Sequence, residues 1–299
     1  MSFFEVVDPQ FGSFVIFNAP VKKLASGFDW VEGPVWFGDA NCLLFSDIPN
    51  NRIMRWRPDG DVSIYREPSN YTNGHTRDRL GRLISCEHGG RRVTRTEHDG
   101  SITVLADRYE GKPFNSPNDV VVKSDGSIWF TDPHYGIMTN YEGYKSEQEL
   151  PCQVYRLNPQ TGSIDAVVTD MVCPNGLAFS PDESLLYVAD TGAIFDANAD
   201  RHIRVYKVDG DRVTDGAHFH TVDPGASDGF RVDSDGNIWS SAADGVHCIS
   251  PKGKLMGKIL VPELVSNVCF GGRNKHQLFI TATTSVYSVI LNREGVQRP

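Results

Sequence analysis

The stretch NDVVVKSDGSIWFTD, residues 118–132, decides the fold. It contains a polar residue, a short β-type run, a turn with Asp and Gly, and a second run of alternating β-type residues. Alternating β-type runs that follow such a turn occur six times, beginning near residues 39, 79, 124, 181, 234 and 272. Self-similarity at a period of about 20 to 50 residues is typical of repeat architectures.

Each recurring run is followed by a segment that reads strand, polar turn, strand. Examples are NRIMRWRPDGDVSIY at 51–65 and CQVYRLNPQTGSIDAVV at 152–168. The unit therefore has four antiparallel strands in about 40 to 57 residues, the size of a propeller blade. Long helical periods and Pro-, Gly- or Ser-rich linkers are both lacking. The sequence predicts an all-β, six-bladed β-propeller that forms a single domain over residues 1–299.

An open ring of blades would expose the edges of its first and last sheets. The segment FVIFNAPVKKLA, residues 14–25, is rich in β-type residues and precedes the first complete blade. The last blade, in contrast, ends weakly at GVQRP. We therefore expect this N-terminal segment to supply a strand to the sixth blade and close the ring.

Charge and composition limit the possible partners. The net charge is −9, which argues against a phosphate-binding surface and hence against nucleic acid. Apolar runs fall far short of the roughly 20 residues that cross a bilayer, so no membrane contact is expected. No secretory signal is apparent, so we expect a cytoplasmic location. The six cysteines lie far apart without a CxxC pair, which predicts reduced, buried thiols rather than a zinc site.

A polar residue stands seven positions before the turn of each unit. The set comprises Glu32, Asn73, Asn118, Asn175, Asp228 and Asn267. These residues begin the innermost strands, so they should converge on the channel axis at one face. Carboxylate and amide oxygens select hard cations such as calcium or magnesium. The alternative is that these residues only cap strand starts, since Asn and Asp are common in turns.

The loop at 132–151, DPHYGIMTNYEGYKSEQELP, is the longest of those expected at this face, which suggests a lid or a disordered excursion. His75, His88 and His134 lie near the same face, and His134 with Tyr135 is the best candidate among them for a substrate contact. The alternative for each of these histidines is a structural role, on the surface or hydrogen-bonded in the core. No GxSxG elbow, Walker A loop or GxGxxG fingerprint is present, which leaves serine hydrolysis, nucleotide hydrolysis and dinucleotide redox unsupported.

Four motifs taken in order resemble the gluconolactonase, or senescence-marker-protein-30, family. They are WVEGPVW around Glu32, NSPNDVVV around Asn118, CPNGLAFSPD around Asn175 and SDGFRVDSDGNIW around Asp228. The resemblance runs from about Ala25 to Tyr287. TDPHYGI and CEHGGRRVTR look more like the bacterial gluconolactonase branch than the animal one.

The resemblance implies a six-bladed propeller and one divalent metal ion, with calcium preferred and magnesium, manganese or zinc as alternatives. It implies that Glu32, Asn175 and Asp228 are ligands, with Asn118 as a further ligand or substrate contact. The animal branch has a substrate-contacting Arg at position 116, where this chain has Ser116, so the sugar preference of that branch does not carry over. The expected substrate-binding set is Asn118, Ser116, His134, Tyr135, Asn73 and His75.

The hypothesis is metal-dependent hydrolysis of a sugar lactone, with the metal polarising the carbonyl and Asp228 as the catalytic base. A small-molecule lactone is thus the expected partner, for a monomer or homodimer. Three alternatives stay open: a calcium-dependent phosphotriesterase-like hydrolase, a strictosidine-synthase-like propeller, which is weakened because it would not need the acidic metal set, and a non-enzymatic binding scaffold.

Overall fold

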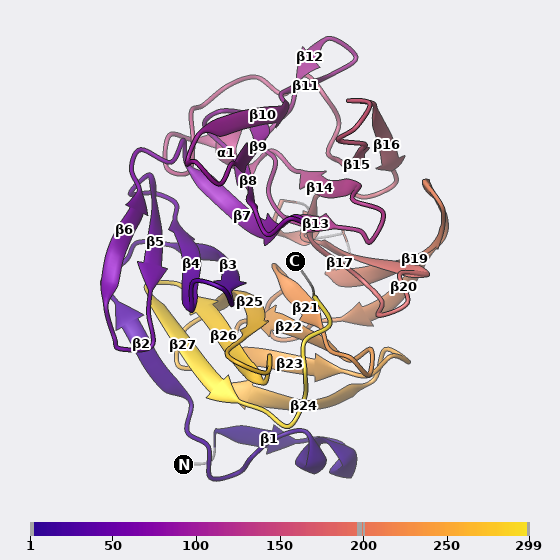
Figure 1. The fold of residues 1–299 in the computed structure, drawn as a ribbon. Helices are drawn as coiled ribbons and strands as arrows, with labels where there is room; N and C mark the ends of the chain where they lie inside the picture. Colours follow the sequence, from indigo (N-terminus) through magenta and orange to yellow (C-terminus); the bar gives the residue numbers. More distant parts are fainter. Residues whose placement is uncertain (1–2, 196–198, 200, 298–299) are drawn as a thin grey trace.

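The structure is a computed structural model, and it describes residues 3–195, 199 and 201–297. Within them, six antiparallel sheets of four or five strands are arranged around one axis, with one edge strand of each sheet nearest the centre (Figure 1). The six-bladed β-propeller predicted from the repeat is therefore confirmed. The described helices are short, and none is long and apolar enough to cross a membrane.

The blades follow one another along the chain. The first two comprise β3 (Val31–Phe37), β4 (Cys42–Asp47), β5 (Arg52–Trp56) and β6 (Val62–Arg66), then β7 (Thr72–Arg77), β8 (Leu83–Glu87), β9 (Arg92–Thr96) and β10 (Ile102–Ala106). The third and fourth comprise β13 (Val120–Val122), β14 (Ile128–Asp132), β15 (Gln153–Leu157) and β16 (Ile164–Val168), then β17 (Pro174–Phe179), β18 (Leu185–Asp190), β19 (His202–Asp209) and β20 (Arg212–Thr221).

The last two blades both take a strand from the N-terminal segment. They comprise β21 (Phe230–Val232), β22 (Ile238–Ala242), β23 (Gly245–Ile249), β24 (Leu255–Leu260) and β1 (Phe4–Val6), then β25 (Val265–Gly271), β26 (Gln277–Ala282), β27 (Ser285–Ile290) and β2 (Lys22–Ser26). The remaining elements are η1 (Pro9–Ser13), β11 (Arg108–Tyr109), β12 (Lys112–Pro113), α1 (Tyr135–Met138) and η2 (Gly192–Ile194).

The ring closes as the sequence predicts, because β2 pairs antiparallel with β27 and becomes the outer strand of the last blade. Only the second half of the 14–25 segment forms this strand. The first half contributes Phe14 to the core and a single bridge from Val15 to Leu291. A strand that was not predicted, β1, pairs with β24 on the outside of the fifth blade (Figure 1).

The hydrophobic core lies between the blades. Buried apolar side chains in the described residues form six clusters, each of which joins neighbouring sheets. In one, Trp129 of the third blade packs edge-on against Phe179 of the fourth, with ring centroids 5.2 Å apart. Alternating side chains of each sheet thus face both neighbours, which explains why the second strand of every blade is buried on both sides.

Near the axis, the backbones of neighbouring blades touch. Gly176 N donates to Asp228 O at 2.9 Å, and Gly74 N donates to Asn118 O at 2.8 Å. A Cβ on Gly176 would lie 2.2 Å from Asp228 O, and one on Gly74 would lie 2.3 Å from Asn118 O. Only glycine lets these strands approach so closely.

We expect Gly176→Ala to lower the free energy of unfolding by about 1–3 kcal/mol, because the added methyl group must push the inner strands of the fourth and fifth blades apart. Thermal unfolding of the two proteins measures the difference. Gly12→Ala is the matched control: its Cβ would meet nothing closer than the Phe17 ring at 3.8 Å. Equal losses in both variants would contradict the close approach.

Candidate functional site

A cavity of about 430 Å³ opens at one end of the central channel. Five of the six repeated polar residues line it: Glu32, Asn73, Asn118, Asn175 and Asp228. The sixth, Asn267, lies directly beside them, since its Nδ2 donates to Glu32 Oε2 at 3.0 Å. The structure therefore brings the whole set together around one point.

Buried carboxylates fix the segments that carry these residues. Asp132 ends β14, and its two oxygens accept hydrogen bonds from the backbone N–H groups of Asn115 and Ser116 at 2.8 Å, just before Asn118. In the same way, Asp190 at the end of β18 accepts from the N–H groups of Val172 and Cys173 at 2.9 Å, just before Asn175. Each acid holds the start of the inner strand in its own blade.

Glu32 is buried, and its two oxygens have different environments. Oε2 accepts hydrogen bonds from Gly33 N at 2.6 Å and from Asn267. Oε1 is shielded from solvent and has no hydrogen-bond partner among the described residues. Burial raises the pKa of the Glu32 carboxyl to about 7 in spite of the two hydrogen bonds, which act in the opposite direction.

Asp228 faces the same cavity. Burial of its carboxyl group raises the pKa well above the usual value, and the negative charges of Glu32 and Glu142 raise it further. A hydrogen bond with Asn175 acts in the opposite direction. Burial and the charge of Glu32 thus both disfavour the ionised form of Asp228, so a proton or a cation must compensate the two acids when they share this cavity.

The donor set fits a divalent cation. The buried Glu32 Oε1 lacks a partner, Asp228 offers a second carboxylate, and the side chains of Asn118 and Asn175 offer amide oxygens at the same cavity. Oxygen donors of this kind suit hard cations, of which calcium accepts the most variable geometry. These four residues would hold the ion.

The remaining residues singled out from sequence are placed differently. Tyr135, the first residue of α1, lines the cavity. His75 and Ser116 are fully buried, and His134 does not reach the cavity wall. Neither of the two buried side chains can contact a substrate in this structure.

Both buried residues have structural partners. His75 is hydrogen-bonded to Ser46 at 2.8 Å and to Ser85 at 2.9 Å, and burial lowers its pKa to about 3, so the ring is neutral. Ser116 Oγ donates to Pro133 O at 2.7 Å and accepts from Gly136 N at 3.0 Å, which fixes the start of α1.

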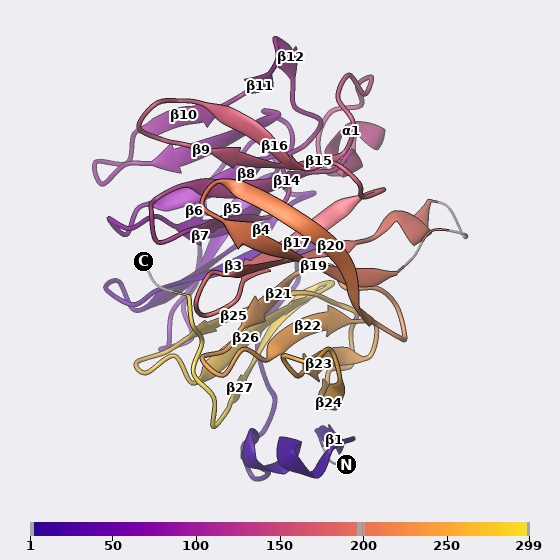
Figure 2. The same ribbon diagram turned by 90° about the vertical axis from the view of Figure 1, so that its right-hand side faces the viewer.

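The loop after β14 is a packed lid. Glu142 reaches the cavity, and its main-chain oxygen lies 3.2 Å from His88 Nδ1. The Nε2 atom of the same His88 ring lies 3.3 Å from Asn73 Nδ2. The ring of Tyr144 packs edge-on against Tyr71 at 5.3 Å. Figure 2 shows the propeller from the side, with α1 at one rim of the ring.

Sequence reasoning missed several lining residues. Trp30 precedes Glu32 within the WVEGPVW motif, and Glu142 lies inside the 132–151 loop, for which the sequence suggests a lid or a disordered excursion. Thr191 and Arg201 flank the long β18–β19 connection, whose length is a signal similar to that of the lid. These residues differ from blade to blade, so the repeat does not reveal them.

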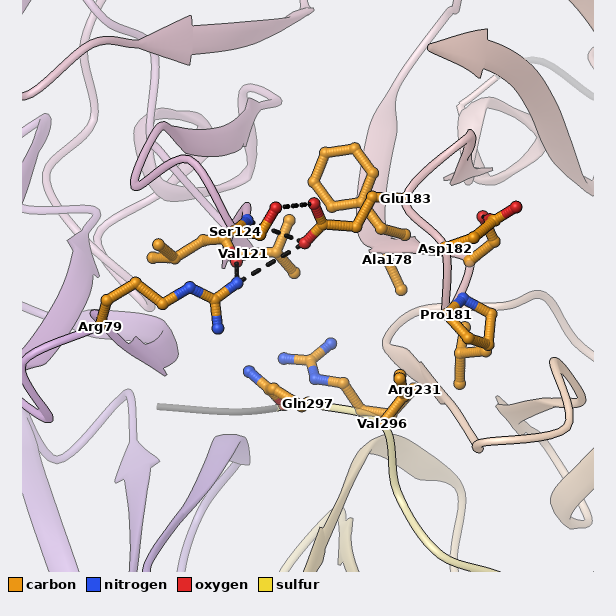
Figure 3. A pocket seen from close by; sticks show the side chains of 14 residues that line it. Arg79, Val121, Ser124, Ala178, Pro181, Asp182, Glu183, Arg231, Val296 and Gln297 are labelled. Carbon is orange, nitrogen blue, oxygen red and sulfur yellow. Dashed lines mark hydrogen bonds and ion pairs between the residues drawn. The ribbon is translucent and has the colours of Figure 1, made fainter. Parts of the chain in front are cut away.

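A second cavity, of about 410 Å³, lies at the other ends of the inner strands β13, β17 and β21 (Figure 3). Its basic side chains already have acidic partners. Arg79 lies 3.6 Å from Glu183, and Arg231 binds Asp119 across the channel at 3.0 and 3.2 Å. Ser124 also donates to Glu183 (Figure 3). Asp182 and Glu183 also line this cavity, but in the described residues none of the six repeated polar residues does.

The sequence matches the SMP-30/Gluconolactonase/LRE-like region over residues 30–284. A gluconolactonase from Zymomonas mobilis is 32% identical over 94% of this chain and 84% of its own. The structure of a gluconolactonase from Xanthomonas campestris is 36% identical, covers 96% of this chain and 94% of its own, and superposes with a TM-score of 0.90. A calcium-binding regucalcin from Agrobacterium tumefaciens shares the fold, with 18% identity over 94% of this chain and 96% of its own and a TM-score of 0.75.

We expect Glu32→Gln to stabilise the metal-free protein at pH 8 more than at pH 5. The folded protein keeps the Glu32 proton up to about pH 7, whereas the unfolded chain loses it near the ordinary value of 4.5. The stability linked to this proton is therefore present below pH 4.5 and lost as the pH rises through 7. Glutamine keeps an oxygen for Gly33 and Asn267 but carries no charge.

Thermal unfolding in the presence of a chelator at both pH values measures this effect. Glu147→Gln, on the exposed part of the lid, is the control and should change the Tm equally at the two pH values. A Glu32→Gln difference that does not vary with pH would contradict the raised pKa.

Proposed function

Because this chain belongs to the SMP-30/gluconolactonase/LRE-like family, we propose that it hydrolyses a sugar lactone to the aldonic acid in the cavity at the channel mouth. The observation that carries the proposal is the pair of buried acids, Glu32 and Asp228, that line one cavity with the amides of Asn73, Asn118 and Asn175. A cavity of about 430 Å³ has room for a monosaccharide lactone.

Glu32, Asn118, Asn175 and Asp228 would hold the divalent ion, and calcium is our first choice because all of their donors are oxygens. When bound, such an ion polarises the lactone carbonyl and stabilises the negative charge that develops on its oxygen. Magnesium, manganese and zinc remain alternatives to be tested.

Asp228 is the base in this proposal. A carboxyl group whose pKa is raised by burial and by neighbouring acids accepts a proton more readily than a solvated aspartate does. The oxygen of a water molecule attacks the carbonyl carbon, and Asp228 takes the proton that this water loses. The ring C–O bond then breaks, and the released ring oxygen takes up that proton to give the hydroxy acid.

Other side chains of the cavity would bind the sugar. The amide groups of Asn73 and Asn118 can exchange hydrogen bonds with ring hydroxyls, and the ring of Tyr135 offers a flat surface for the C–H face. Ser116 acts indirectly in this proposal, because it fixes the start of α1 and thereby the position of Tyr135. The lid would limit the access of bulk solvent and so strengthen these contacts.

We expect the protein to hydrolyse aldonolactones, with loss of activity in chelator and recovery with added calcium. Proton release from a panel of sugar lactones and one fluorophosphate, with calcium, magnesium, manganese or zinc, measures this. Faster hydrolysis of the fluorophosphate would favour a phosphotriesterase instead. Activity that survives complete chelation would contradict the metal-dependent proposal, and no hydrolysis at all would leave the propeller as a binding scaffold.

We expect Asp228→Asn to lower kcat by about 10²–10⁴-fold, which is the usual contribution of a general base, while calcium binding weakens but persists. Steady-state kinetics and calorimetric calcium titration separate the two effects. Asp165→Asn, on the exposed outer strand β16, is the matched control and should leave kcat within about twofold. If Asp228→Asn kept both calcium binding and activity at the wild-type level, Asp228 would not be the base.

A further inference from the structure

Three potential metal ligands meet behind the wall of the catalytic cavity, although they are far apart in the sequence. They are His134, Cys152 and Cys173, and a ring nitrogen and the two sulfur atoms all lie within 4.8 Å of one another. His134 Nδ1 is 3.2 Å from Cys152 Sγ. Both cysteines are buried, and neither is in a disulfide bond. In the described residues this is the one cluster of His, Cys, Asp and Glu groups with such spacing.

We infer that His134, Cys152 and Cys173 form a second metal site, which takes a thiophilic d¹⁰ cation, Zn²⁺. Two thiolates and an imidazole are the donors that zinc prefers, whereas calcium and magnesium require oxygen. In a tetrahedral zinc site the ligand atoms stand about 3.5–4 Å apart, close to the separations that are already present here. Small side-chain rotations are enough to receive the ion.

The charge balance also favours this assignment. Both cysteines bind as thiolates, so the two thiolates and Zn²⁺ together carry no net charge and suit a buried position. Gln148 Nε2 lies 3.6 Å from Cys152 Sγ and can donate to the bound thiolate, in the way that outer groups support metal ligands elsewhere. His134 is only partly buried, which leaves a path by which the ion and a water molecule as fourth ligand can enter.

The location gives the site a structural role. His134 stands at the beginning of the lid and Cys152 at its end, immediately before β15. Cys173 immediately precedes β17, which carries Asn175. An ion bound here would tie both ends of the lid to the inner strand of the next blade. It would thereby fix Tyr135 and Glu142 at the cavity wall.

Cobalt(II) tests the site directly, because it replaces zinc and gives a thiolate-to-metal charge-transfer band in the near ultraviolet only when sulfur is a ligand. We expect reduced, metal-free protein to develop this band with one equivalent of Co²⁺ and to lose it when Zn²⁺ is added. Glu32→Gln should keep the band, since the oxygen ligands at the channel mouth contribute no sulfur. This readout does not depend on hydrolytic activity, so it stands apart from the proposed function.

Cys152→Ser and Cys173→Ser should each abolish the band and weaken zinc binding by more than about 100-fold. His134→Ala removes the partly exposed ligand and serves if a cysteine variant fails to fold. Cys42→Ser, a buried cysteine at the start of β4, is the matched control and should retain the band. Absence of the band in the folded, reduced wild-type protein would overturn the inference. So would a band that persists without both cysteines.

Discussion

The contact between the backbones of neighbouring blades at the axis is the constraint on which the rest of this structure depends. Gly176 and Gly74 lie so close to Asp228 O and Asn118 O that a methyl group would not fit at either position. The inner strands can therefore begin almost in contact, and the residue before each glycine turns its side chain into the shared space. This approach lets side chains from different blades, Glu32 and Asp228 among them, line a single cavity.

A hydrogen-bonding pattern that repeats along the chain positions the start of the inner strand within its blade. The acid at the end of the second strand, Asp132 or Asp190, accepts two hydrogen bonds from the backbone that leads to the inner strand. The first blade varies this pattern, with Asp47 accepting from Asp29 N at 3.1 Å and pairing with Arg52. Buried acids thus fix the backbone before Asn118, Asn175 and Glu32, whereas Ser241 Oγ accepts the hydrogen bond from Asp228 N at 2.8 Å in the fifth blade.

The surroundings of the lid contain two different donor environments within a short span of chain. Asn175 contributes an amide oxygen to the cavity, whereas Cys173, two positions earlier, contributes a sulfur to the cluster behind its wall. In our two proposals this short segment would therefore offer oxygen to a hard cation in the cavity and sulfur to a soft cation behind its wall. Tyr135 stands between the two environments, and its hydroxyl is hydrogen-bonded to Thr191.

The sequence by itself determined the number of blades and the spacing of the polar residues, because both follow from a repeat with a fixed offset. Glu32, Asn118, Asn175 and Asp228 could be found for the same reason. The sequence also indicated the strand that closes the ring, because a β-rich segment precedes the first complete blade. Only the tertiary structure decided that His75 and Ser116 are buried away from the cavity, that Trp30, Glu142 and Arg201 line it, and that Cys152 and Cys173 meet His134. These positions depend on how loops of unequal length pack across blade boundaries, and the sequence repeat does not predict such contacts.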